Sequence, residues 1–153
     1  SGRHFDKNGN LNDWWTAEDA TAFETRADVL RQFFNNIEIA PDIKANGEYT
    51  LGENLADYGG VTIAFDAYKK FGTPSNESGG LTPEMRFFIA YAGTWAQNIR
   101  PEEALRLTKT DEHSLGQNRV NGILPHIDAW YKAFDIQPTD KLYIKPENRI
   151  KLW

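Results

Sequence analysis

The chain has 153 residues, enough for one domain with a useful hydrophobic core, and we expect a single domain over residues 1–153. Its net charge of −5 argues against a nucleic-acid-binding surface. No apolar run approaches the roughly 20 residues needed to cross a bilayer, so this segment is not expected to contact a membrane.

The first 50 residues predict a turn, a long helix and a second turn. Asn8-Gly9 is typical of a turn, because glycine accepts a positive φ. Thr16 is a candidate helix N-cap, with Asp13 as the alternative start, and the apolar spacing that follows predicts a helix through Phe34. Asn46-Gly47 predicts the second turn.

A second long helix is predicted from about Glu53 to Phe71 by the helical spacing of apolar residues after Tyr58. The polar stretch 72–80, rich in Gly, Ser, Pro and Asn, is expected to form a loop.

Prolines mark the expected helix starts in the second half of the chain. Pro83 is expected at the start of a helix that reaches Gln97, and Pro101 opens a short helix through Leu107. A further helix is predicted over residues 121–134, with Pro125 in its first turn or at its true start, followed by an irregular tail from residue 136. The fold class is therefore mainly α, with four or five helices and little sheet.

The most informative local feature is a pair of acids in this second helix. Glu53 and Asp57 are four residues apart, so both carboxylates project from one face of a helix. Two buried acids would be costly unless they bind a cation or accept hydrogen bonds. The alternative is a solvated pair near the helix N-terminus, where the helix dipole favours negative charge.

The full string Gly52–Gly60, GENLADYGG, resembles the E-N-x-A-D-x-G-G signature of the neprilysin and endothelin-converting-enzyme family of zinc metallopeptidases. Three more blocks resemble this family in the expected order: GRHFDKNGNL with DWWT near the start, KTDEHS with NRV at 109–120, and PENR near the end.

The resemblance implies the C-terminal helical part of a zincin-like (thermolysin-like) catalytic domain, and it implies roles for four residues. Glu53 would be the third zinc ligand, and Asp57 would accept a hydrogen bond from a zinc-binding histidine. His113 would donate to the oxyanion that forms on the scissile carbonyl. Arg119 would clamp a substrate backbone carbonyl, with Gly116 allowing the loop between these two residues to fold tightly.

The other two zinc ligands of this family are histidines of an H-E-x-x-H helix. The chain has only His4, His113 and His126, and no two of them are four apart. We therefore expect a Zn²⁺-dependent metalloendopeptidase acting on oligopeptides, completed by an upstream part of the same polypeptide. Residues 1–153 alone are expected to bind zinc weakly and to hydrolyse no peptide.

Two other functions are compatible with the sequence. The chain could be a non-catalytic helical scaffold or peptide-binding domain derived from the family. It could also be a hydrolase using Glu53 and Asp57 as acid and base, although adjacent turns of one helix do not easily flank a sugar from opposite sides. The lack of cysteine favours a microbial member of this family, because animal members are tied by disulfides. The resemblance implies the periplasm or the cell surface, with a cytoplasmic location as the alternative.

Several other residues invite functional assignments that we do not make. Asp6 begins a run that alternates like a calcium loop, but Leu11 and Ala17 stand where an EF-hand needs Gly and Glu, so a turn is expected. His126 is expected to be structural or solvated, and the Trp14-Trp15 pair to be packing residues. His4 matches no catalytic position.

Overall fold

The computed structural model describes residues 2–72 and 78–152 and is mainly helical, as expected. Six α-helices lie within these residues: α1 (Ala17–Asn35), α2 (Leu51–Phe71), α3 (Pro83–Thr94), α4 (Pro101–Thr110), α5 (Gly116–Asn121) and α6 (Asp128–Phe134). A short antiparallel hairpin of β1 (Glu38–Ala40) and β2 (Ile43–Lys44) follows α1. Three 3₁₀ turns complete the described elements: η1 (Gly2–His4), η2 (Leu124–His126) and η3 (Pro146–Asn148).

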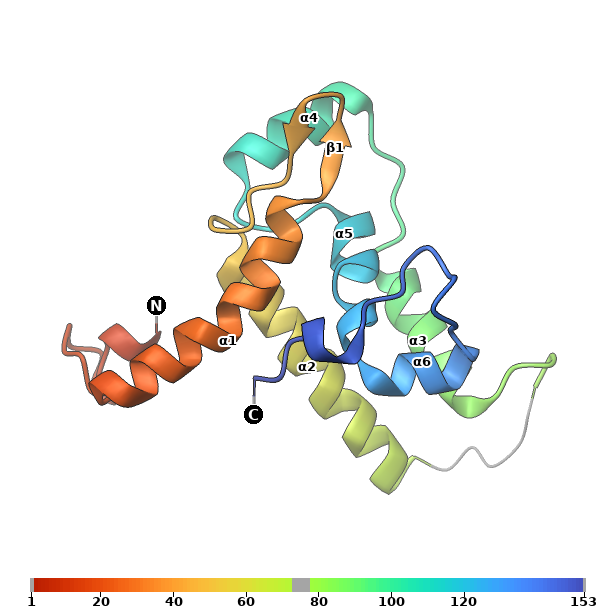
Figure 1. Cartoon of the computed structure of the whole chain (residues 1–153), viewed down its shortest axis with the longest axis horizontal. Coiled ribbons are helices and arrows are strands. Elements are labelled where there is room, and N and C mark those ends of the chain that lie inside the picture. The colour runs from red at the N-terminus through yellow and green to blue at the C-terminus, as the bar shows by residue number, and fades with distance from the viewer. Residues whose placement is uncertain (1, 73–77, 153) are drawn as a thin grey trace.

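The helices surround a central position that α5 occupies (Figure 1). Helix α1 packs against α2, α3 packs against α6, and β1 lies against α4 at one end of the molecule. Residues 2–16 form an arm beyond the start of α1, and the C-terminal segment returns toward α1 and α2 (Figure 1). The fold therefore brings α2 and α5, far apart in sequence, into the same region.

Side-chain caps and prolines set the helix starts. The hydroxyl of Thr16 accepts a hydrogen bond from the backbone N–H of Asp19 at 3.1 Å, which confirms the predicted N-cap. Thr82 caps α3 in the same way, and Pro83 and Pro101 occupy the first helical positions of α3 and α4, where no backbone N–H is needed.

The prediction for residues 121–134 is wrong in one important respect. Instead of one helix, the chain forms α5, then η2, then α6. A Cβ on Gly122 would approach the Phe34 ring to 2.6 Å, so the backbone passes α1 at a distance only glycine permits. Pro125 has no N–H to continue a helical ladder. Helix α5 also begins before the predicted range, so Arg119 lies on a helix and not at the end of the loop expected from the sequence.

Two helix ends and the hairpin also differ from prediction. Helix α3 ends at Thr94 and not at Gln97, whereas α4 continues to Thr110. The hairpin between α1 and α2 was not predicted, because its strands are only three and two residues long. Of the expected loop 72–80, residues 73–77 lie outside the described part, and Gly79 and Gly80 adopt positive φ beside the Ser78–Leu81 bridge.

One hydrophobic cluster joins these elements. Its buried members come from α1, α2, α3, the α5–α6 connection and the tail: Leu30, Phe34, Tyr58, Val61, Phe65, Phe88, Ile123, Leu124, Ile127 and Ile150. The tail is irregular, as predicted, but it is fixed to this cluster. Tyr58 donates its hydroxyl hydrogen to the carbonyl of Ile150 at 3.1 Å, and the backbone N–H of Ile150 donates to Nδ1 of His126 at 3.2 Å. The tail thereby anchors the middle of α2.

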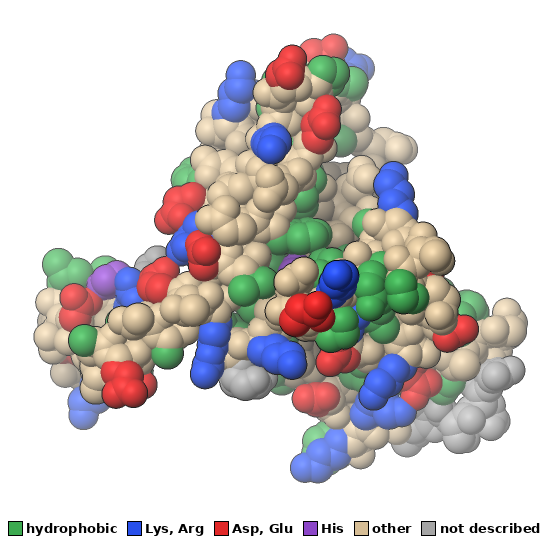
Figure 2. Space-filling view, viewed as in Figure 1, with side chains coloured by type: hydrophobic (Ala, Val, Ile, Leu, Met, Phe, Trp, Pro, Cys, Tyr) green, Lys and Arg blue, Asp and Glu red, His purple; other side chains and the backbone are tan. Residues whose placement is uncertain are grey.

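On the face seen in Figure 2, acidic and basic side chains are interspersed, and hydrophobic side chains gather in the hollow between α1 and the C-terminal segment. Within residues 2–72 and 78–152, none of the helices is both long enough and apolar enough to cross a membrane.

Candidate functional site

Both acids of the signature helix face the same part of the chain. Glu53 lies in the first turn of α2 and Asp57 one turn later. Their partners, His113 and Arg119, come from the segment between α4 and the end of α5. Both carboxylates therefore lie on one side of α2, as predicted, and both meet this segment of the chain.

Asp57 and Arg119 form a bidentate pair. Nε of Arg119 donates to Oδ2 of Asp57 at 2.6 Å, and Nη2 donates to Oδ1 at 2.7 Å. The side chains are only 10% and 14% exposed, so the pair is shielded from solvent. The Asp57 hydrogen bonds raise the pKa of Arg119 above its ordinary value. The guanidinium also lies over the ring of Trp95, with Cζ 3.6 Å from the centroid, and we call these three residues the Asp57 cluster.

Glu53 lies in a more open cluster with His113 and Asp111, which we call the Glu53 cluster. Nε2 of His113 is 3.2 Å from Oε2 of Glu53, and Nδ1 is 2.9 Å from Oδ1 of Asp111. Asp111 also accepts the backbone N–H of His113 at 2.9 Å, which lowers its pKa. The hydrogen bond that His113 donates to Asp111, and then the charge of Glu53, raise the pKa of His113. All three side chains are 37–43% exposed.

A buried amide next to Glu53 holds the His113 loop against α2, and it was not predicted from the sequence. Asn54 is 1% exposed. Its Oδ1 accepts from the Ser114 hydroxyl at 2.8 Å, and its Nδ2 donates to the Thr50 hydroxyl at 2.9 Å. These bonds tie the loop that carries His113 to the start of α2. A signal for Asn54 was present in the sequence. Its helical spacing with Tyr58 and Val61 places an amide on the buried face of α2, where a polar side chain needs hydrogen-bond partners.

Helix α5 is held close to the end of α3. A Cβ on Gly116 would lie 2.5 Å from the carbonyl oxygen of Trp95, so Gly116 permits a close backbone approach and not the tight loop expected. The hydroxyl of Tyr91 donates to the carbonyl of Arg119 at 2.9 Å. Burial, and then the charge of Asp57, raise the pKa of Tyr91 well above its ordinary value. Trp95 and Tyr91 were both missed from sequence.

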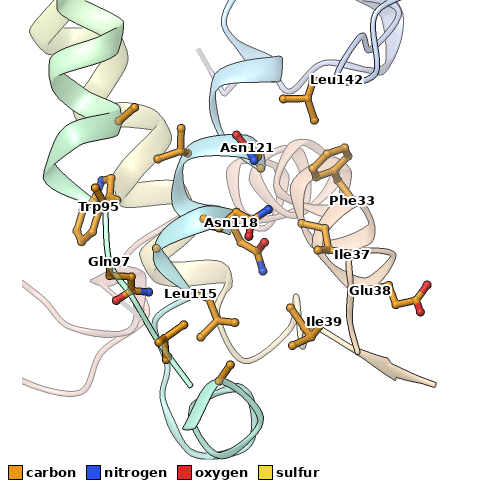
Figure 3. A pocket seen from close by; sticks show the side chains of 18 of the residues that line it. Phe33, Ile37, Glu38, Ile39, Trp95, Gln97, Leu115, Asn118, Asn121 and Leu142 are labelled. Atoms are coloured by element: carbon orange, nitrogen blue, oxygen red, sulfur yellow. The ribbon is translucent and has the colours of Figure 1, made fainter. Parts of the chain in front are cut away.

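A cavity of about 660 Å³ lies along another side of α5 (Figure 3). Asn118 projects from α5 toward Phe33 and Ile37, and Leu142 of the tail closes one side (Figure 3). Its lining includes Trp95 but none of Glu53, Asp57, His113 or Arg119. A separate surface hollow of about 430 Å³ is lined by His113 and Asp111 together with residues of α4.

The remaining candidates have structural surroundings. His126 is 3% exposed and serves as the acceptor for the tail, and burial lowers its pKa to about 4. Asp6 accepts backbone N–H groups of Asn8 and Asn10, as the predicted turn requires. Trp15 packs on Phe23, and Trp14 contacts the Trp15 ring edge to face, so both tryptophans pack on a neighbouring ring as predicted, although Trp14 is 61% exposed. His4 contacts Asp13 within the N-terminal arm.

Comparison with known proteins gives a consistent assignment. The model of peptidase family M13 matches residues 1–150. The chain is 36% identical to neutral endopeptidase of Lactobacillus helveticus, with all of the chain aligned to 22% of that protein. It is 37% identical to membrane metallo-endopeptidase-like 1 of Homo sapiens, again over its whole length and over 20% of that protein.

A solved structure gives the same assignment. The crystal structure of Mycobacterium tuberculosis zinc metalloprotease ZMP1 in complex with an inhibitor matches with a TM-score of 0.91 and 35% identity, over 99% of this chain and 24% of that one. The fold is therefore that of the C-terminal part of such peptidases. The chain spans about a fifth to a quarter of the length of these relatives.

Proposed function

This chain belongs to peptidase family M13, and we propose that it supplies the third zinc ligand and the substrate-binding residues of a zinc-dependent metalloendopeptidase that hydrolyses oligopeptides. The observation that carries this proposal is the juxtaposition of Glu53 with His113 and of Asp57 with Arg119. Residues separated by about 60 positions meet on one side of α2 as two pairs, each of one carboxylate and one basic side chain.

Zinc fits this chain only in part. Among the described residues, no group of three or more His, Cys, Asp or Glu side chains could hold a metal ion. Glu53 is a half-exposed carboxylate that could serve as one ligand, and a catalytic site needs two more from the protein. We assign those two to imidazoles in the remainder of a longer polypeptide. When bound, zinc would polarise a carbonyl and lower the pKa of a water molecule.

The residues of this chain would bind and orient the peptide. His113, fixed by Asp111, would donate a hydrogen bond to the oxygen that becomes negative during peptide hydrolysis. Arg119 retains three N–H groups beyond the two that bind Asp57, and these could donate to a substrate backbone carbonyl. Asp57 has acceptor capacity left for a histidine N–H.

One contact must change for His113 to act in this way. Nε2 of His113 faces Glu53, and a single N–H cannot serve Glu53 and the substrate equally well. Because both side chains are substantially exposed, little packing opposes their separation. We propose that Glu53 turns to the metal when the imidazole ligands are present, which frees Nε2 of His113.

One observation argues against the acid–base alternative for Glu53 and Asp57. Both oxygens of Asp57 accept hydrogen bonds from Arg119, so this carboxylate is paired with a cation of its own chain and is not left free to act on a substrate. The scaffold or peptide-binding alternative keeps the same substrate contacts and differs only in lacking activity.

For location, we propose the periplasm or the cell surface, with the cytoplasm as the alternative.

The test is substitution in a peptidase that contains this chain. Glu53→Ala is expected to abolish both bound zinc and peptide hydrolysis, because the metal loses a protein ligand. Glu112→Ala, at an exposed neighbour of His113, is the matched control and should retain both. Zinc content by atomic absorption and hydrolysis of a fluorogenic peptide are the readouts. Full zinc content in Glu53→Ala would refute the ligand assignment.

A further inference from the structure

The guanidinium of Arg119 is constrained in two independent directions. The two hydrogen bonds to Asp57 fix rotation within its plane. The Trp95 ring, 3.6 Å below Cζ, fixes the orientation of the plane itself. A carboxylate alone leaves an arginine free to tilt about the axis of the two hydrogen bonds, so the aromatic face adds a constraint that Asp57 cannot provide.

The backbone of Trp95 is fixed as well. Its N–H bonds to the carbonyls of Ala92 and Gly93 at the end of α3. The close approach of Gly116 to the Trp95 carbonyl locks α5, and hence the Arg119 backbone, to the same point. Figure 3 shows Trp95 at this end of α3, beside the helix that carries Asn118.

The indole N–H contributes less to this arrangement than the face of the ring. Within the described part of the chain, Nε1 of Trp95 is buried and forms no hydrogen bond of standard geometry, although it interacts with the side chain of Tyr91 and partly offsets the rise that burial causes in the pKa of that hydroxyl. The face of the ring makes the contact with Arg119. Among the aromatic residues, tryptophan offers the strongest attraction to a cation above its ring.

We propose that Trp95 is a positioning residue, which sets the plane of the Arg119 guanidinium so that its unbonded N–H edge points in one direction toward a peptide carbonyl. The inference rests on the proposed function of Arg119 as a substrate clamp. Trp95 acts through Arg119, and the expected effect of losing the stack is weaker peptide binding with little change in the rate of the bound complex.

The first experiment needs only residues 1–153. The side-chain Nε–H of Arg119, assigned by its loss in Arg119→Lys, should give an NMR signal that is slow to exchange and shifted upfield by the indole ring. Trp95→Leu should remove the shift and speed exchange, whereas Trp95→Phe should keep most of both. Ile89→Ala, on the exposed face of α3, is the matched control and should leave the signal in place. An unchanged Arg119 signal in Trp95→Leu would overturn the inference.

The second experiment uses a peptidase that contains this chain. Trp95→Leu should raise KM about tenfold and keep kcat within about twofold, and Trp95→Phe should restore most of the affinity. Ile89→Ala, on the exposed face of α3, is the matched control and should change neither KM nor kcat. If circular dichroism shows that Trp95→Leu does not fold, Trp95→Met takes its place in both experiments.

A double-mutant cycle separates positioning from direct contact with the peptide. If Trp95 acts through Arg119, the effect of Trp95→Leu on KM should vanish in an Arg119→Ala background. Persistence of the effect would overturn the positioning role. An unchanged KM in Arg119→Ala itself would reject the proposed clamp, and the NMR experiment would still decide whether Trp95 holds the guanidinium.

Discussion

The two acid clusters of α2 lie one turn apart and differ in almost every physical property. The Asp57 cluster is shielded, bidentate and stacked on an aromatic ring. The Glu53 cluster is substantially exposed and held by single contacts. Buried bidentate pairs resist rearrangement, whereas exposed pairs contribute little and exchange partners easily. The difference is compatible with the proposed roles, in which the Asp57 cluster orients a substrate and Glu53 exchanges its contact with His113 for a metal.

The largest expected difference between the clusters is in stability. Asp57→Ala should lower the free energy of unfolding of residues 1–153 by about 3 kcal/mol, because it leaves the Arg119 charge shielded and unpaired. Glu53→Ala should change it by less than about 0.5 kcal/mol, as for other exposed ion pairs. Urea denaturation of both variants gives the comparison. Equal losses would show that the two clusters do not differ as described.

The same substitution should reduce activity in a peptidase that contains this chain. If Asp57 orients a zinc-binding histidine, Asp57→Ala should weaken metal affinity or turnover by roughly 10–100-fold. Wild-type zinc content together with a wild-type rate in this variant would count against that role.

A third effect comes from His126, which anchors the tail behind α2. Its pKa falls from 6.5 to about 4 on folding, so the unfolded chain binds more protons between these values and stability declines as the pH falls below about 6.5. At pH 5 the loss should be about 2 kcal/mol relative to pH 7. His126→Asn, measured by urea denaturation at both pH values, should remove most of this dependence. A wild-type dependence in that variant would assign the acid sensitivity elsewhere.

The smallest expected effect is on the pKa of His113, and it shows which partner dominates the Glu53 cluster. His113 should titrate above its ordinary pKa, so the stability that its partners add is present below pH 6.5 and is lost as the pH rises through the folded value. Asp111→Asn should lower this pKa more than Glu53→Gln does, since the Asp111 hydrogen bond is the leading cause. NMR titration of the His113 ring measures both shifts. The reverse order would mean that Glu53 is the dominant partner.

Local sequence patterns predicted much of the fold and little of the site. The cap at Thr16, the prolines that open α3 and α4 and the periodicity of α2 are all local signals. Helix α5 has only six residues, too few to show a period, and close approaches at its two ends, near Gly116 and Gly122, determine where it lies.

The partners within the site are long-range contacts. Asp57 meets Arg119 across 62 positions and Asn54 meets Ser114 across 60, and no local spacing encodes such pairs. The family resemblance supplied roles for Asp57 and Arg119, but it did not indicate that they bind each other. Trp95 was missed because an aromatic residue at a helix end is equally typical of core packing.

Calorimetric titration of zinc tests the central claim most directly, namely that this chain carries one ligand in an adaptable cluster and needs imidazoles from another part of a polypeptide. Residues 1–153 alone should show only weak zinc binding without a defined stoichiometry, and no peptidase activity. Adding a polypeptide with an H-E-x-x-H helix should produce binding that depends on Glu53. Tight binding of one zinc ion by residues 1–153 alone would contradict the account.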